Sequence, residues 1–514
     1  MLFRCRFLLS ILGVQVGEKY LKLVNPDAKK CSKLVNLAVK KCSKLVKVRY
    51  YLYNFDDEKT WSLIMERMKL AELEKWYRKS RRKPLVVWGA RQVGKTYLVK
   101  ELFAKRNFSD FLYIDLKKDD EACAFFSTTS DPEKYLRYIE ARYGKKINSN
   151  VPLVFDEVQQ CHQVLSSLKY FKQDYPELVV IATGSLVRLS IKHDESKGRK
   201  DDFLFPVGCI DSINVYPLTF EEYLLNANKE MLERIKKAYN DKKPLEEYEH
   251  QMALDYLYEY LAIGGMPEPL SVFLNEKSYV NARESIREIY DNYLADMDLY
   301  NVSKETIFRT KNVFKNIYSE LNKENKNFKI GAIEKGKSNR DYFNAYQWLE
   351  LAKVIYRSKK KQGKVVSPLS EEDDGLFRFY LSDTGVFSYQ SKTSQTDYFV
   401  KEKRNSLTGI FYENYVADEF VAKEIPLFYW VGKGGHEFEF IVENQSKIIP
   451  IDVKKTKGKM NSLDAFRSVN PKTTAIKIST NHFGYDEERD ILTVPLYEVF
   501  LLADDLACDR PLIR

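Results

Sequence analysis

Cysteine and histidine are scarce in this sequence, and neither is grouped. Seven cysteines are spread through the 514 residues without a C-x-x-C pair, and the five histidines form no ligand cluster. Zinc sites need several such ligands at short spacing, and disulfide frameworks need paired cysteines in an oxidising compartment. The composition therefore argues against both and predicts a reducing compartment, so we expect a cytoplasmic protein.

Long hydrophobic runs are lacking as well, and so is a net charge on most of the chain. No stretch approaches 18 uninterrupted apolar residues, so we expect no membrane-spanning helix and no membrane partner. The formal net charge of +10 arises in residues 1–50, which hold 12 Lys and Arg residues against 2 acidic ones. The remaining chain is neutral overall, so any nucleic-acid site must be a local patch.

The segment 1–64 differs in composition from everything after it. The run KKCSKLV at residues 29–35 recurs at 40–46, and this period of 11 suits a basic helix. One interpretation is a basic arm for a membrane or a nucleic acid. The other, which we favour, is a loose extension translated upstream of a start at Met65 or Met68.

A short apolar run ends on Gly89 and leads into G-x-x-x-x-G-K-T, the phosphate-binding P-loop pattern. Gly89 and Gly94 allow backbone N–H groups to approach a polyphosphate. Lys95 supplies a positive charge between the β- and γ-phosphates, and the Thr96 hydroxyl is a ligand for Mg²⁺. The helical pattern that follows contributes its N-terminal dipole. The residues predicted to hold ATP are Gly89, Ala90, Arg91, Gln92, Val93, Gly94, Lys95, Thr96 and Tyr97.

Further buried strands are predicted at residues 111–115, 151–157, 178–185 and 213–215, with helical segments between them. This alternation predicts a parallel sheet of the α/β class with its site at the carboxyl ends of the strands. Asp156 and Glu157 end one strand, where Asp156 is expected to hold Mg²⁺ and Glu157 to polarise the attacking water. Thr183 and Ser185 end the next strand, and Thr183 is expected to sense the γ-phosphate or orient water. A simple Thr-Gly-Ser turn is the alternative for this pair.

The second half of the chain reads as helices followed by smaller α/β units. Residues 220–300 are rich in helical patterns, broken at 264–267. A predicted helix at Ile307–Glu320, another that follows Ser338, and paired strands at Val354–Arg357 and Leu376–Leu381 suggest a winged helix. Its basic residues (Arg357, Lys359, Lys360, Lys361 and Lys364) suit DNA phosphates, a solvated loop or a protein-docking winged helix. The acidic run at 371–374 that follows them weighs against DNA.

Several motifs together resemble prokaryotic AAA-type ATPases that carry a C-terminal domain of unassigned function. The motifs are GARQVGKT (89–96), VFDEVQ (154–159), ATGS (182–185), YPLTFEEYL (216–224), GGMPE (264–268), LNKEN (321–325), WL (348–349) and YLSDTG (380–385). The resemblance implies a P-loop NTPase fold with a helical lid, a winged helix and a nuclease-like end domain. The implied boundaries are a basic extension at 1–64, an ATPase core at 65–225, a lid at 226–300, a winged helix at 301–400 and a restriction-endonuclease-like domain at 405–514. Cys209 stands where the family often has a basic residue.

The end domain holds a second group of candidate residues. A hairpin centred near Gln445 would set Glu439 opposite Asp452, with Lys454 on the same face. This is similar to the D…(D/E)-x-K nuclease motif, with Glu439 in place of the usual Asp and Glu413 as the extra acid. One interpretation is a Mg²⁺ site in which Glu413, Glu439 and Asp452 hold the metal, while Asp452 and Lys454 act in phosphodiester cleavage. The other is an inactive nuclease-like scaffold with a cross-strand charge pair.

The sequence thus predicts an AAA-type enzyme that binds ATP and Mg²⁺ and hydrolyses ATP to drive or gate its C-terminal domains. One alternative is an ATP-gated regulatory or DNA-binding switch with little turnover. Another is a Mg²⁺-dependent DNA nuclease. DNA and a second copy of the chain, as a homo-oligomer, are the candidate macromolecular partners.

Overall fold

The structure is a computed structural model, and it describes residues 65–185, 206–299, 303–370, 375–399, 409–454 and 460–512. The described part of the chain belongs to one compact unit. The basic extension at 1–64 lies outside the described residues, as does the acidic run at 371–374. Arg188, which the sequence makes a candidate to face the nucleotide, lies outside them too. Both interpretations of the extension therefore stay predictions.

Five strands form a parallel sheet in the order β2-β3-β4-β1-β5. The strands are β1 (Leu85–Gly89), β2 (Leu112–Asp115), β3 (Leu153–Asp156), β4 (Val180–Gly184) and β5 (Asp211–Val215). β1, β3 and β4 are buried along their whole length, as is typical of strands covered on both faces, whereas the edge strands β2 and β5 are partly exposed. The predicted parallel α/β sheet is confirmed, and β4 lies between β1 and β3.

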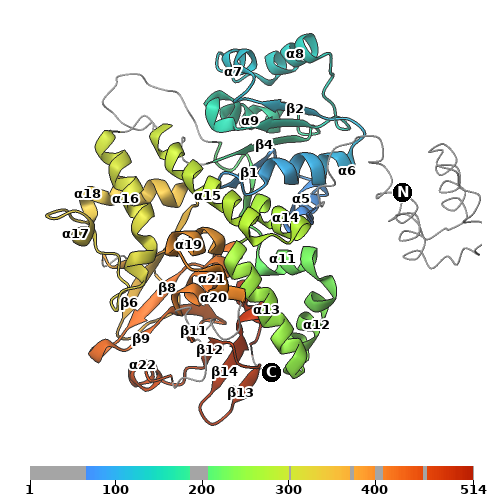
Figure 1. Cartoon of the computed structure of the whole chain (residues 1–514). Helices are drawn as coiled ribbons and strands as arrows, with labels where there is room; N and C mark the ends of the chain where they lie inside the picture. Colours follow the sequence, from blue (N-terminus) through green and yellow to red (C-terminus); the bar gives the residue numbers. More distant parts are fainter. Residues whose placement is uncertain are drawn as a thin grey trace, which may run out of the picture. The chain divides into compact units, whose positions relative to one another are not determined.

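Helices cover both faces of this sheet, and alternate residues of β1 enter different cores. Val86 and Trp88 pack with α7 (Asp120–Phe126), α8 (Pro132–Tyr143) and α9 (His162–Asp174). Leu85 and Val87 pack in the other core, with α5 (Lys69–Tyr77) and with η1 (Tyr97–Ala104), which continues as α6 (Lys105–Asn107). Figure 1 shows α7 and α8 above the sheet and α5 and α6 on its opposite side.

Five helices follow the sheet, as the helical patterns of residues 220–300 predict. They are α11 (Phe220–Ala227), α12 (Lys229–Asn240), α13 (Glu247–Ile263), α14 (Pro267–Glu276) and α15 (Tyr279–Asp296). A capping box formed by Thr219 and Glu222 starts α11. The break at Gly264 ends α13, and Pro267 occupies the first turn of α14.

Three further helices lead to a β-hairpin in the predicted order. They are α16 (Lys304–Leu321), α17 (Ile330–Ile333) and α18 (Asn339–Leu351), followed by β6 (Ile355–Gln362) and β7 (Phe377–Leu381). The expected capping box of Ser338 and Asp341 starts α18. β6 extends five residues beyond the predicted Val354–Arg357, so Lys359, Lys360 and Lys361 lie in a paired strand. After β7 come α19 (Thr384–Ser391) and α20 (Gln395–Phe399).

The hairpin also pairs with the last part of the chain. β6 runs parallel to β8 (Phe428–Val431), which pairs with β9 (Glu437–Phe438), so one sheet has the order β7-β6-β8-β9. This pairing crosses the boundary that the sequence predicts between 400 and 405. A third sheet has the order β10-β11-β12-β14-β13. Its strands and the helices around it are α21 (Gly409–Ala422), β10 (Phe440–Asn444), β11 (Lys447–Val453), α22 (Leu463–Val469), β12 (Ala475–Ser479), β13 (Gly484–Asp486), β14 (Ile491–Pro495) and α23 (Val499–Ala507).

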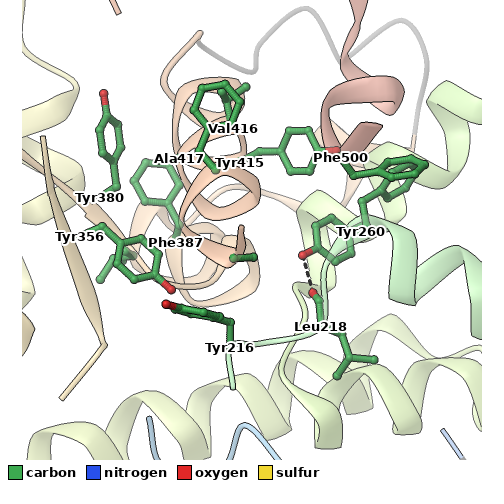
Figure 2. Packing of buried hydrophobic residues seen from close by; sticks show 14 of the residues in the cluster. Tyr216, Leu218, Tyr260, Tyr356, Tyr380, Phe387, Tyr415, Val416, Ala417 and Phe500 are labelled. Carbon is green, nitrogen blue, oxygen red and sulfur yellow. Dashed lines mark hydrogen bonds between the residues drawn. The ribbon is translucent and has the colours of Figure 1, made fainter. Parts of the chain in front are cut away.

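Helix α21 lies in the centre of a core that the first and second halves of the chain share. Figure 2 shows Tyr415 of α21 among side chains from α13, β6, α19 and α23, and from the segment that follows β5. Tyr216 from that segment meets Tyr356 of β6 with ring centroids 6.5 Å apart. The Tyr260 hydroxyl donates to the Leu218 carbonyl at 2.6 Å. The nucleotide-binding half is therefore packed directly against the C-terminal half.

Candidate nucleotide site and carboxylate cluster

The loop between β1 and η1 has the backbone form that the P-loop pattern requires. Gln92 and Gly94 adopt positive φ angles of 63° and 86°. At Gly89, a Cβ atom would lie 2.3 Å from the Val215 carbonyl oxygen of the neighbouring strand. Glycine is needed at Gly89 for close packing and at Gly94 for the left-handed turn.

Lys95 lies buried under this loop. Its ammonium donates to the carbonyl oxygens of Gly89 at 3.1 Å and Ala90 at 2.7 Å. Burial lowers the pKa of Lys95 to about 8, while the nearby carboxylates of Glu157 and Asp156 oppose that shift. Without a nucleotide, the Lys95 ammonium therefore has only neutral carbonyl partners in this loop. A phosphate anion would be a stronger hydrogen-bond partner for it.

Asp156, at the end of β3, accepts hydrogen bonds from the start of the P-loop helix, from side chains of β2 and β4, and from the backbone that follows β3. Its carboxylate accepts from Thr96 Oγ1 at 2.7 Å, Tyr113 OH at 2.5 Å, Thr183 Oγ1, and the Glu157 backbone N–H at 3.0 Å. The two predicted Mg²⁺ ligands, Thr96 and Asp156, are therefore in direct contact. Hydroxyl and carboxylate oxygens are the donors that Mg²⁺ takes from proteins, so these residues fit the expected ion.

Glu157 follows Asp156 in a left-handed backbone conformation, with φ of 56°. After this turn the two carboxylates have different partners: Asp156 bonds Thr96 and Thr183, and Glu157 bonds Gln159. The Gln159 side-chain amide donates to the Glu157 carboxylate, and the Gln159 oxygen accepts from the Ser185 backbone N–H at 3.1 Å. A Cβ at Gly184 would lie 2.6 Å from that same oxygen. The structure therefore brings together Glu157 and the Thr183–Ser185 strand end through Gln159.

Two arginines tie the P-loop to neighbouring helices. Arg91 forms an ion pair with Asp296 at the end of α15, and the Tyr293 hydroxyl donates to the Arg91 carbonyl at 3.4 Å. The buried Arg67 donates to the carbonyls of Val93 and Tyr216, both at 2.8 Å. It also ion-pairs with Glu222 at 3.1 Å.

Arg67, Tyr113 and Asp296 are site residues that the sequence does not reveal. Arg67 stands alone before a helix, and Tyr113 is one aromatic residue within an apolar strand. Only Tyr113 offers a weak sequence signal for a place in the site. It puts a polar hydroxyl between two apolar residues of a strand that leads to the predicted site.

The second predicted group also comes together, at one edge of the third sheet. Phe440 pairs with Ile451, so Glu439 and Asp452 adjoin as the predicted hairpin requires. Lys454 Nζ lies 2.9 Å from Asp452 and 4.0 Å from Glu439. Burial and the Glu439 charge raise the pKa of Asp452 to about 7. Burial also raises the pKa of Glu413, which extends from α21.

Lys326 enters this cluster from the loop after α16, which the sequence gives no reason to expect. Its Nζ lies 2.5 Å from Glu413, 3.6 Å from Glu437 and 3.7 Å from Glu439. In the described ranges, no group of three or more acidic, His or Cys side chains has a geometry that could hold a metal ion. The predicted Mg²⁺ site of Glu413, Glu439 and Asp452 thus does not fit the side chains as they stand.

None of the helices described has the length and hydropathy that a bilayer crossing needs. Comparison with known proteins then gives three family matches. Residues 81–224 match the family model of an AAA domain. Residues 254–397 and 408–498 match two different domains of unknown function. No curated protein matches the chain.

Solved structures with similar folds are distant in sequence. The Walker-type ATPase PABY2304 of Pyrococcus abyssi is 15% identical, with 65% of this chain and 99% of that chain covered and a TM-score of 0.39. The ORC1 protein of Aeropyrum pernix, solved in complex with DNA, is 12% identical over 63% of this chain and 91% of its own, with a TM-score of 0.27. AMPPCP-bound DnaA from Aquifex aeolicus is 13% identical over 55% and 86%, with a TM-score of 0.23. The family match, the parallel sheet and the P-loop together indicate that residues 81–224 form an AAA-type P-loop domain.

Proposed function

We propose that this chain binds ATP with Mg²⁺ and hydrolyses it, using the cycle to gate its C-terminal half. The observation that carries the proposal is the Asp156 carboxylate, which accepts hydrogen bonds from both Thr96 and Thr183. Asp156 contacts both the P-loop helix and the end of β4. An ion bound between Asp156 and a phosphate would therefore change the hydrogen bonds of both elements.

The chain's own groups divide the work. The backbone N–H groups of residues 89–96 and the Lys95 ammonium bind the phosphates, and Thr96 and Asp156 would hold Mg²⁺, which supplies charge neutralisation. Glu157 orients a water molecule and accepts its proton, and Gln159 fixes the carboxylate that does so. Arg91 of this loop forms an ion pair with Asp296 of α15, in the predicted lid. A movement of the loop on nucleotide binding would therefore move α15 as well.

Replacing Glu157 by Gln tests the hydrolytic assignment. Glutamine keeps the shape of the side chain but accepts no proton, so we expect ATP affinity within about twofold of wild type and a kcat reduced about 10²–10⁴-fold. Steady-state phosphate release and equilibrium binding of a fluorescent ATP analogue measure the two effects. Glu140→Gln, on the exposed face of α8, is the matched control and should turn over normally. Normal turnover in Glu157→Gln would place the base elsewhere.

A second candidate function, an ATP-gated DNA-binding switch, is favoured by the exposed face of α18. Arg340, Phe343, Asn344 and Gln347 are all exposed there, at a spacing that puts them on one side of the helix. Arg pairs with guanine, Asn and Gln pair with adenine, and Phe contacts the thymine methyl group. The lysines of β6 contribute less to such a surface than expected, because the side chains of Lys359, Lys360 and Lys361 are only partly exposed.

Duplex DNA separates the two candidates. For a switch, we expect DNA to bind with an affinity that changes with nucleotide, and Asn344→Ala with Gln347→Ala to weaken binding about tenfold or more. Fluorescence anisotropy of labelled duplex, with and without a non-hydrolysable ATP analogue, provides the measurement. Asn275→Ala, on the exposed face of α14, serves as a control. Unchanged DNA affinity in the α18 variant would remove this surface from consideration. The expected homo-oligomer and cytoplasmic location stay predictions.

A further inference from the structure

The carboxylate cluster of the C-terminal half contains a lysine where a nuclease-like centre would hold a metal ion. Lys326 is 15% exposed at its side chain, and its ammonium faces Glu413, Glu437 and Glu439 within 2.5–3.7 Å. A lysine ammonium carries three N–H donors and no acceptor, so three surrounding glutamates are partners that it can satisfy. These contacts make Lys326 part of the centre.

The backbone around Lys326 holds it in this position. The next residue, Asn327, accepts a hydrogen bond from the Tyr429 hydroxyl at 2.5 Å. The Phe328 backbone N–H donates to the Phe377 carbonyl at 2.9 Å, at the start of β7. The segment is therefore fixed between β7 and β8, and a swing of Lys326 into solvent would require these bonds to break.

Glu413 depends on this lysine. Its carboxylate is 2% exposed, and among the described residues Lys326 is the cation with which it forms an ion pair. Among the described residues, neither its second oxygen, Oε2, nor Asp452 Oδ2 has a hydrogen-bond partner, and both oxygens are buried. Buried carboxylate oxygens without partners are costly, so these two oxygens remain available to a cation that takes the place of the lysine.

Other charged side chains surround Lys326 and its glutamates. Arg378 bonds Glu437 at 2.6 Å and lies over the Tyr429 ring at 4.1 Å. Glu439 lies between Lys326 and Lys454 and accepts from the Val453 backbone N–H at 3.1 Å. Magnesium and manganese need oxygen ligands at about 2.0–2.2 Å, and an ammonium 2.5 Å from Glu413 leaves no space for an ion beside that carboxylate.

We propose that Lys326 is a built-in cation that fills the metal position of this cluster. The wild-type chain then holds no divalent ion there. Withdrawal of the lysine opens a site for one divalent cation of the Mg²⁺/Mn²⁺ class between Glu413, Glu439 and Asp452. The cluster works as an ion-paired joint between the α16–α17 loop and the third sheet, and it cleaves no phosphodiester while Lys326 is in place.

Mn²⁺ titration of nucleotide-free protein, followed by the electron paramagnetic resonance signal of the free ion, tests the proposal. We expect Lys326→Ala to take up one Mn²⁺ per chain more than wild type. Lys326→Ala combined with Glu413→Gln should lose that additional ion. Lys323→Ala is the matched control, because this exposed lysine on the same loop pairs with Glu320 outside the cluster, and it should behave as wild type.

Two results would overturn the proposal. In the first, a folded Lys326→Ala protein, with an unchanged circular dichroism spectrum, takes up no additional Mn²⁺. In the second, the wild-type chain itself binds Mn²⁺ and Glu439→Gln or Asp452→Asn removes it, which would restore an ordinary metal centre. The second comparison does not depend on whether Lys326→Ala folds. Lys326→Arg, which keeps the positive charge, should also gain no ion.

Discussion

Replacing Lys95 by Ala should abolish measurable ATP binding. On binding ATP, we expect the buried ammonium to exchange its Gly89 and Ala90 carbonyl partners for up to two hydrogen bonds with phosphate oxygens. Each charge-assisted hydrogen bond contributes about 1.5–3 kcal/mol, so affinity should fall at least about a hundredfold. Isothermal titration calorimetry with ATP and Mg²⁺ measures the loss. The exposed Lys105→Ala variant, on the same helical segment, is the control and should bind normally.

The role of Lys95 in ATP binding also predicts how ATP affinity changes with pH. Because burial lowers the pKa of Lys95 to about 8, the free protein loses this positive charge as pH rises past that value. Phosphate binding favours the charged form, so ATP affinity should decline above about pH 8 with one proton taken up per ATP bound. Below about pH 7 the lysine is charged in both states, and this dependence should vanish. Affinity retained by Lys95→Ala would rule out the P-loop as the nucleotide site.

Replacing Gly265 by Ala should destabilise the whole described unit by about 3 kcal/mol or more. A Cβ at this position would lie 1.9 Å from the Leu218 carbonyl oxygen and 2.8 Å from the Leu218 carbonyl carbon. These are backbone atoms, so no side-chain rotation relieves the clash. Urea unfolding followed by tryptophan fluorescence should show a lower transition midpoint.

The cost is large because Gly265 joins three segments. Its N–H donates to the buried Asp383 carboxylate at 2.6 Å, and its carbonyl accepts from the Leu218 N–H at 2.7 Å. Asp383 also accepts from the Val386 N–H at 2.9 Å, where α19 begins. A Cβ at Gly265 therefore strains the contact between the segment after β5, the end of α13 and α19.

Gly331→Ala is the matched control for this substitution. Gly331 lies in α17, and a Cβ there would meet no atom within 4 Å. Alanine favours helix by about 1 kcal/mol over glycine, so this variant should be as stable as wild type or slightly more stable. Equal destabilisation by the two substitutions would show that the Gly265 contact has no special weight.

Local patterns predicted the nucleotide-binding sheet well, because each signal lies within a few neighbouring residues. The apolar run before Gly89 and the two acids after Phe155 each mark a strand end by composition alone. The parallel arrangement of such strands then brings Thr96, Asp156 and Thr183 together without further information. The hairpin register that adjoins Glu439 and Asp452 follows from alternation in the same way.

Contacts between distant segments were not predictable from those patterns. Arg67 reaches Glu222 across 155 positions, and Lys326 reaches Glu413 across 87. Each is a single charged residue without a local partner, so the sequence shows only an exposed cation. The pairing of β6 with β8 was missed for a related reason. Three consecutive lysines are typical of a solvated loop, and the strand whose backbone pairs with them lies far away in the sequence.

The central position of α21 has a consequence for how the chain matures on the ribosome. Tyr216 and Tyr260 emerge during synthesis well before α21 at 409–422, against which Tyr260 finally packs, with Tyr415 at a centroid distance of 6.0 Å. At about 5–20 residues per second, roughly ten to forty seconds pass between the two events. During that time Tyr216 and Tyr260 lack their C-terminal packing partners, so we expect the nascent N-terminal half to expose an aromatic surface that chaperones bind until α21 has been made.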